Sequence, residues 1–154
     1  MRVQRTIVVD REPERVFALV SDPNRYPEFF VGITRWEPAS RKRRGPGARF
    51  RVRMRVGSIE AGGEVKVTAW KPGRLIAWAA ERGIPQRGAW RLRPVRAGTE
   101  IRLEVEFDLS GGPLGRLVER AVGRIVGRNL SATLLAVRRI LEQEGSVAAV
   151  EARA

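Results

Sequence analysis

The chain has 154 residues, of which 43% are hydrophobic and 31% charged, a composition typical of one folded globular domain. It contains no cysteine and no histidine, which excludes disulfides, thiol nucleophiles, thiolate or imidazole zinc sites and every catalytic triad that uses histidine. The formal net charge is +13 and is carried almost entirely by arginine, so an anionic partner must be weighed against ion pairing within the fold.

Residues 2–10 predict a first strand because they are rich in Val, Ile and Thr. A helix with Pro13 in its first turn follows, and Asp22-Pro23-Asn24 ends it and opens a second short helical stretch over about residues 23–30. Alternating apolar and polar residues predict six more strands, at 33–38, 49–56, 64–69, 75–81, 90–93 and 101–109. No apolar run reaches the ~20 residues of a membrane span and the N-terminus lacks a continuous apolar signal region, so we expect a cytoplasmic protein.

Short turns between these strands predict an antiparallel meander with one apolar face and one charged face. On the charged face we expect Arg91 and Arg93 to lie near Glu104 and Glu106. The segment Ser110-Gly-Gly-Pro113 should end the sheet, and Pro113 should begin a long helix that reaches about Gln143. The predicted fold is therefore α+β: two short helices after strand 1, and a curved antiparallel sheet of about seven strands wrapped around a long C-terminal helix.

The predicted organisation is a single domain at residues 1–144, followed by a flexible C-terminal tail at residues 145–154. A sheet that curves around a helix without closing on it leaves a cavity between the two. The oligomeric state stays open between a monomer and a homodimer. Gly123 and Gly127, four residues apart on the predicted helix, indicate close packing, a bend or a dimer contact.

Three stretches resemble a known superfamily. They are residues 16–29 (VFALVSDPNRYPEF), Trp90-Arg-Leu-Arg-Pro94 with Gly98-Thr-Glu-Ile101, and the Gly-Pro-Leu-Gly segment at 112–115. Together with the order of the elements over residues 1–143, they resemble the START/SRPBCC superfamily with its helix-grip fold. The similarity is greatest to bacterial polyketide cyclase/dehydrase-like and coenzyme-Q-binding-like members.

This resemblance implies the binding or transport of a hydrophobic small molecule, such as a lipid, an isoprenoid quinone or a polyketide. Because the superfamily also contains aromatase/cyclases and ribosome-associated proteins, two alternatives stay open. One is a polyketide cyclase or dehydratase, and the other is RNA or ribosome binding through an arginine-rich surface. No motif in this chain allows catalytic residues to be transferred one by one.

Strand phase and helical spacing predict the residues that line the cavity. On the strands they are Phe50, Val52, Met54, Val67, Trp78, Trp90, Leu92, Leu103, Val105 and Phe107, and on the helix Leu114, Val118, Ala121, Val122 and Ile125. The alternative is a filled core without a ligand, since any domain of sheet and helix needs inward apolar residues.

Asn129 continues the apolar stripe of the helix, and a buried amide there would either bind the head group of a ligand or pair with the backbone. Phe29, Phe30 and the residues up to Ile33 follow the second short helix. They would gate the cavity or touch a membrane, or they would pack against the C-terminal helix, and the same ambiguity applies to Trp36.

Two basic groups are candidate anion-binding sites for the phosphates of RNA or of a membrane lipid. One is a loop with Arg41, Lys42, Arg43 and Arg44, and the other is a helical stripe of Arg116, Arg120, Arg124 and Arg128. The alternative is a solvated surface that only confers solubility.

Conventional catalytic signals are poor in this sequence. It has no glycine-rich nucleotide-binding motif, and we expect no metal and no cofactor. The strand phases of Glu37 and Glu81 are ambiguous, and an inward carboxylate would be a candidate general acid.

Overall fold

Seven antiparallel strands form one sheet in the order β1-β7-β6-β5-β4-β3-β2 in the computed structural model, which describes residues 1–109, 111 and 114–154. The strands are β1 (Arg2–Val9), β2 (Ile33–Pro38), β3 (Arg49–Val56), β4 (Ile59–Lys71), β5 (Leu75–Gly83), β6 (Gln86–Val95) and β7 (Gly98–Phe107). The predicted meander is confirmed: β2 to β7 follow one another through turns, and β1 pairs with β7.

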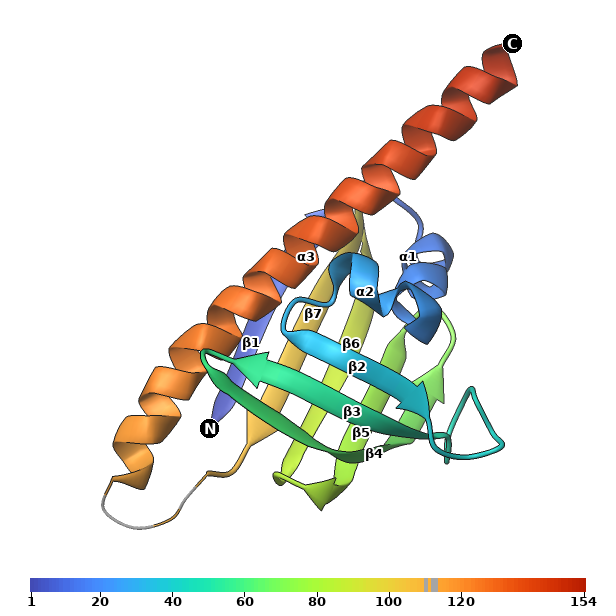
Figure 1. Ribbon diagram of the computed structural model, residues 1–154. Helices are drawn as coiled ribbons and strands as arrows, with labels where there is room; N and C mark the ends of the chain where they lie inside the picture. The colour runs from blue at the N-terminus through green and yellow to red at the C-terminus, as the bar shows by residue number, and fades with distance from the viewer. Residues whose placement is uncertain (110, 112–113) are drawn as a thin grey trace.

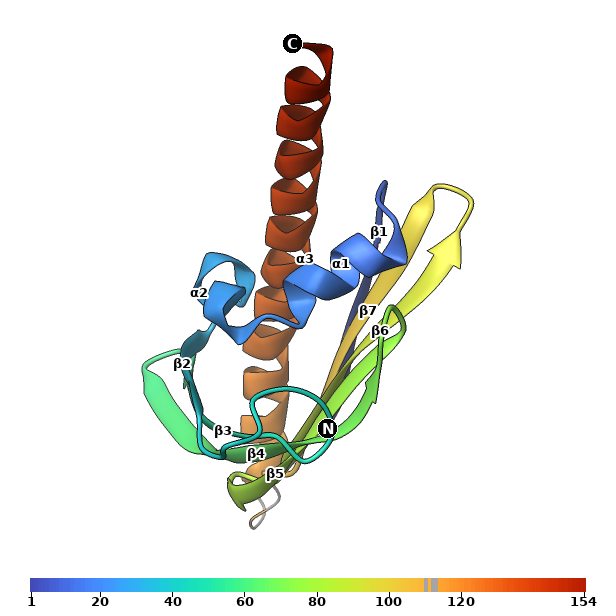
Figure 2. The ribbon, with the colours of Figure 1, turned by 90° about the vertical axis from the view of Figure 1, so that its right-hand side faces the viewer.

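The helical elements cover the concave side of the sheet. They are α1 (Pro13–Val20), the 3-10 turn η1 (Pro23–Arg25), α2 (Tyr26–Phe29) and α3 (Gly115–Arg153). In Figure 2 the sheet curls so that β2 and β3 lie on one side of α3 and β1, β7 and β6 on the other. The expected helix-grip arrangement, with two short helical segments after the first strand and one long C-terminal helix, is confirmed (Figure 1).

The connection between β1 and β2 is fixed by specific local contacts. Pro13 begins α1, and four apolar residues of this helix are buried: Val16, Phe17, Leu19 and Val20. The Asp22 carboxylate accepts a hydrogen bond from the Asn24 backbone N–H at 3.1 Å, which caps η1. The buried Tyr26 hydroxyl donates to the Val20 carbonyl at 3.0 Å, so α2 is tied to the end of α1.

Ion pairs cover the convex face, although the predicted partners are only partly right. Arg91 pairs with Glu104 at 2.8 Å, as expected. Arg93 pairs instead with Glu100, and Glu106 pairs with Arg87, both at 2.9 Å. The reason is the register of β6 and β7, which sets Arg93 directly opposite Glu100 and Arg87 directly opposite Glu106.

The C-terminal helix ends later than predicted. It continues to Arg153 instead of ending near Gln143, because the last residues include several alanines and no proline, which allow the helix to continue through Gly145. Arg25 pairs with Glu144 at 2.7 Å, whereas the final turns project away from the sheet (Figure 1). That residues 145–154 are flexible stays a prediction, and the predicted helix start at Pro113 lies outside the described residues.

Gly123 and Gly127 mark the line along which β1 crosses α3. A side-chain carbon at Gly123 would collide with the Met1 sulfur, and one at Gly127 would collide with the Arg5 guanidinium. Side chains from the start of the chain and from β1 therefore pack against both glycines, which matches close packing among the explanations that the spacing allows.

Candidate functional site

Aromatic side chains fill one half of the space between the sheet and the helices. The aromatic cluster consists of Tyr26, Phe29, Phe30, Trp36, Phe50, Trp78 and Trp90. Most contacts within it are edge-to-face, for example Phe30 on Trp90 with ring centroids 5.6 Å apart. In this half the predicted cavity is occupied by the side chains that were expected to line it.

The segment after α2 is fastened to the helix that it faces. Phe29 and Phe30 are buried, and the Val31 backbone N–H donates to the Thr133 hydroxyl oxygen of α3 at 3.0 Å. Thr133 itself is fully buried. These contacts match the packing alternative for residues 29–33, and the structure gives no opening at Phe29 or Phe30.

The remaining strand positions that were expected to face inward have that orientation. Val52, Val67, Leu92, Leu103, Val105 and Phe107 are all buried, and Met54 is half-buried. Contact of these side chains with a ligand stays a prediction.

The fold encloses α3 tightly only over the middle of the helix, where most of its buried residues lie, from Gly127 to Leu141. Along the apolar stripe, Val118 is 50% exposed, Val122 and Ile125 are half-buried, and Thr133 and Val137 are fully buried. The start of α3, from Leu114 to Val118, therefore presents apolar side chains that the sheet does not cover. We call this region, between the start of α3 and the facing parts of β3 to β6, the open half of the grip.

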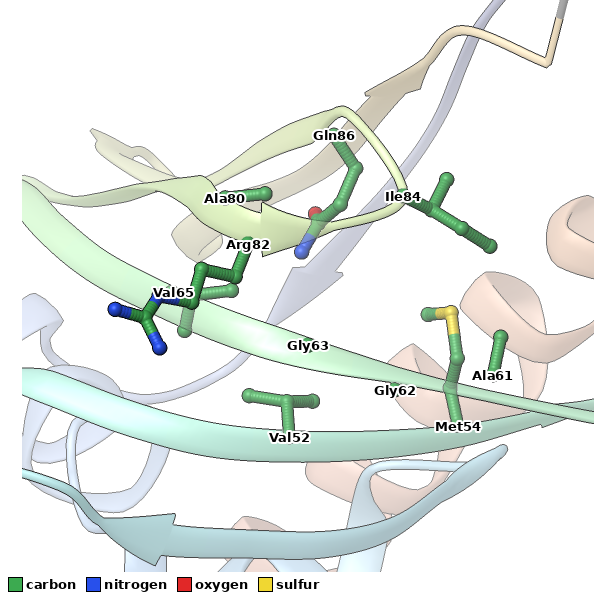
Figure 3. A pocket seen from close by; sticks show the side chains of 10 residues that line it. All are labelled: Val52, Met54, Ala61, Gly62, Gly63, Val65, Ala80, Arg82, Ile84 and Gln86. Carbon is green, nitrogen blue, oxygen red and sulfur yellow. The ribbon is translucent and has the colours of Figure 1, made fainter.

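A small pocket lies at the edge of the open half, between β3, β4, β5 and β6 (Figure 3). It is lined by Val52, Met54, Ala61, Gly62, Gly63, Val65, Ala80, Arg82, Ile84 and Gln86. Met54 and Gln86 extend toward the space between them (Figure 3). The space measures about 30 Å³, enough for one or two water molecules and far below the ~300–1,000 Å³ of a typical small-molecule site.

Indole N–H groups supply unused hydrogen-bond donors beside the aromatic rings. Trp78 Nε1 donates to Gln86 Oε1 at 3.2 Å, whereas Trp36 Nε1 and Trp90 Nε1 are buried without a partner. A buried donor without an acceptor is costly, and among the described residues these two indole groups have none. Trp36 also borders a second small space of about 20 Å³ beneath Arg43 and Arg44.

Of the residues that line the pocket, sequence reasoning named only Val52 and Met54, and Gln86 and Ala80 are among those it missed. Both alternate with Trp residues that were placed correctly, since Gln86 precedes Trp90 by four residues and Ala80 follows Trp78 by two. The same strand phase would have found them. Asn129 lies half-buried where the open half meets the gripped half, with its amide against Gly32.

The acidic residues with ambiguous phase both face solvent. Glu37 pairs with Arg35 at 3.4 Å, and Glu81 pairs with Arg49 at 2.7 Å. The hydrogen bond from Arg49 holds the pKa of Glu81 below its usual range, the opposite of what a general acid near neutral pH requires. Neither residue is therefore placed to act on a molecule inside the grip.

The basic candidates are all exposed, both the loop residues 41–44 and the four arginines of the helical stripe. A separate groove of about 570 Å³ lies on the convex face, with Arg51, Arg53 and Arg82 beside Glu60 and Glu64. No helix in the described part of the chain combines the length and the apolar character that crossing a membrane requires.

Known proteins with this architecture were found by structural comparison. A protein from Thermus thermophilus superposes with a TM-score of 0.78 at 18% identity, over 90% of this chain and 95% of that one. The Zhui aromatase/cyclase from a Streptomyces species superposes with a TM-score of 0.76 at 21% identity, over 93% of this chain and 94% of that one. A START superfamily protein from Mycobacterium smegmatis superposes with a TM-score of 0.71 at 19% identity, over 92% of this chain and 97% of that one.

At these identities the likeness shows the fold alone. No curated protein matches the sequence at a significant level. A family model does match, over residues 1–142, which include all seven strands and most of α3. The chain therefore belongs to the family described as polyketide cyclase / dehydrase and lipid transport.

Proposed function

We propose that the protein binds a hydrophobic small molecule, such as a lipid, an isoprenoid quinone or a polyketide, in the open half of the grip. The observation that carries this proposal is the start of the apolar stripe of α3, where Val118 is 50% exposed and Val122 and Ile125 are only partly buried. An apolar ligand inserted there would remove surface from water on both sides, at about 25 cal/mol per Å² before the costs of association.

The pocket widens when such a ligand enters. Its present space of about 30 Å³ is bounded on two sides by Met54 and Ile84, of which Met54 is half-buried and Ile84 is exposed. An unbranched methionine changes rotamer at little cost and re-packs around differently shaped guests.

Few polar side chains in this site are available to form hydrogen bonds with a ligand. The Gln86 amide can donate from Nε2 while its Oε1 accepts from Trp78, and Asn129 borders the same open half. These groups suit a carbonyl or hydroxyl oxygen on an otherwise apolar molecule. The family description covers both lipid transport and cyclase chemistry, and binding is favoured over catalysis because Glu37 and Glu81 face solvent.

Two neighbouring alanines on β5 provide a direct test. Ala80 lines the pocket, whereas Ala79 points to the opposite, convex face and lines a groove there. We expect Ala80→Phe to weaken binding of a short-chain ubiquinone at least tenfold, because the ring occupies the pocket, and Ala79→Phe to leave binding unchanged. Quenching of tryptophan fluorescence reports binding, and urea unfolding of each variant checks that it is folded.

Equal binding by wild type and Ala80→Phe would refute this location. A cyclase, the alternative function, would convert a linear polyketide analogue at a rate that falls in Asn129→Ala while binding is retained.

A further inference from the structure

Exposed aliphatic side chains gather at one end of the molecule. Ile59 follows the β3–β4 turn and is 67% exposed, Ile84 lies in the β5–β6 turn, and Leu117 in the first turn of α3 is 66% exposed. Leu114 and Val118 flank Leu117 on the same helix and are also exposed. We call these five residues the apolar rim.

Contacts show that the elements carrying the rim meet at this end. The Asp108 backbone N–H donates to the Pro85 carbonyl at 3.1 Å, and the Leu109 N–H donates to the Glu119 carboxylate at 3.2 Å. The end of β7 thus joins the β5–β6 turn to the start of α3. The β3–β4 turn reaches α3 at Gly57, where a side-chain carbon would lie 3.6 Å from Ile125 Cδ1. The rim residues therefore lie on elements that meet at the end of the fold where α3 begins.

Cations flank the rim. Arg116 and Arg120 lie on the same turns of α3 as the apolar residues, and Arg82 and Arg55 lie close to the two hairpin turns. All four side chains are exposed. Glu119, an acid in the same part of α3, is engaged by the Leu109 N–H. Two other exposed acids, Glu60 and Asp108, lie at this end, and Glu60 accepts a hydrogen bond from Thr34 at 3.2 Å. The four arginines outnumber these acids, on a chain of net charge +13.

We propose that this end docks on the surface of an anionic lipid bilayer. Aliphatic side chains enter the headgroup region, and flanking arginines bind lipid phosphates while their alkyl stems stay among the acyl chains. The inference rests on the proposed function, because docking here sets the open half of the grip against the membrane from which a hydrophobic ligand would be taken. A single-stranded RNA partner is disfavoured because the rim holds no aromatic side chain on which a base would stack.

Vesicle binding tests the docking end with a matched control on the same helix. The variant Ile59→Glu/Leu117→Glu alters the rim outside the ligand pocket, and Val147→Glu/Val150→Glu adds the same charges at the far end of α3, at side chains 57% and 69% exposed. Sedimentation is measured with vesicles of phosphatidylcholine alone and with 30% phosphatidylglycerol. We expect the wild type and the Val147/Val150 variant to bind the anionic vesicles, and the Ile59/Leu117 variant to bind at least tenfold more weakly.

The arginines are tested separately. Arg116→Gln/Arg120→Gln should lower binding to anionic vesicles several-fold, whereas Arg41→Gln/Arg43→Gln in the β2–β3 loop should lower it less. Equal losses in the Ile59/Leu117 and Val147/Val150 variants, or no binding by wild type, would overturn docking at this end. So would binding of single-stranded RNA that displaces the protein from vesicles and is unaffected by the Ile59/Leu117 changes.

Failure of docking and failure of ligand binding are distinguishable. Ubiquinone binding in solution, followed by tryptophan quenching without vesicles, should be the same in Ile59→Glu/Leu117→Glu and in wild type. Intact quinone binding with no vesicle binding would reject the docking surface and leave the ligand site standing. The reverse result would reject the ligand site and with it the reason for docking.

Discussion

The packing of Trp78 in the aromatic cluster requires a residue without a side chain at position 88, which is Gly88. It pairs directly with Trp78 across β5 and β6, and a methyl group at Gly88 would overlap the Trp78 indole. We expect Gly88→Ala to lower the free energy of unfolding by about 1–3 kcal/mol, as overpacking of a core does. Urea unfolding followed by fluorescence measures this. Gly111→Ala is the control, because nothing lies within 4 Å of its added carbon; an equal loss there would contradict the explanation.

Glu104 links stability to pH. Burial raises the pKa of its carboxyl group, but hydrogen bonds from Arg2 at 2.7 Å and Arg91 at 2.8 Å lower it by more, so the folded-state pKa lies below the usual value of 4.5. Because the pKa is lowered by folding, the stabilisation is complete above pH 4.5 and is lost as pH falls through the folded-state pKa.

Glu104→Gln tests this link. At pH 7 the variant should be less stable by about 1–3 kcal/mol, the worth of hydrogen bonds to a charged group, and the difference should shrink below pH 4. Thermal unfolding from pH 7 to pH 3 measures both. A difference that stays constant across this range would mean that the carboxylate charge contributes nothing.

The sequence predicted which face of the sheet each charged residue occupies, but it did not predict every ion-pair partner. The alternation of Arg91, Arg93, Glu104 and Glu106 placed all four on the outer face, and only the register decided that Arg93 meets Glu100. Register depends on the turn at residues 96–98, where Gly98 adopts a φ of 130° against the Val9 carbonyl. The amino-acid composition of β6 and β7 does not determine the geometry of this turn, so it does not determine which residues stand opposite one another.

The long helix α3 has three parts with different surroundings. Its first turns border the open half, its middle is gripped, and its last turns project from the sheet (Figure 1). The apolar stripe has the same spacing in the first two parts, so periodicity predicted one continuous buried face. The curvature of the sheet, together with α1 and α2 packing on the middle of α3, leaves Val137 fully buried and Val118 50% exposed. For the same reason the sequence could name inward aromatic residues but not show that they fill half of the space.

Truncation of the C-terminus tests whether the last turns of α3 contribute to the stability of the fold. Deletion of residues 147–154 should change the free energy of unfolding by no more than about 0.5 kcal/mol, the range of surface changes. Leu141→Ala should cost about 2–5 kcal/mol, since this side chain is 2% exposed in the gripped part. Denaturant unfolding compares the two, and a large loss on truncation would show that the final turns belong to the folded domain.

The molecule as a whole combines a rigid half and an open half. The aromatic cluster and the Thr133–Val31 hydrogen bond fix α2 and the middle of α3 to the sheet. At the other end lie the start of the apolar stripe, the small pocket and the apolar rim, so the proposed ligand site and the proposed docking surface share one location.

The most direct test of ligand binding is native mass spectrometry of the gently purified protein and of Ala80→Phe, each also after incubation with lipid, quinone and polyketide mixtures. Solvent extraction then identifies whatever is bound. We predict one hydrophobic molecule per chain in the wild type and none in the variant. A wild type that stays bare in every mixture would contradict the proposed function.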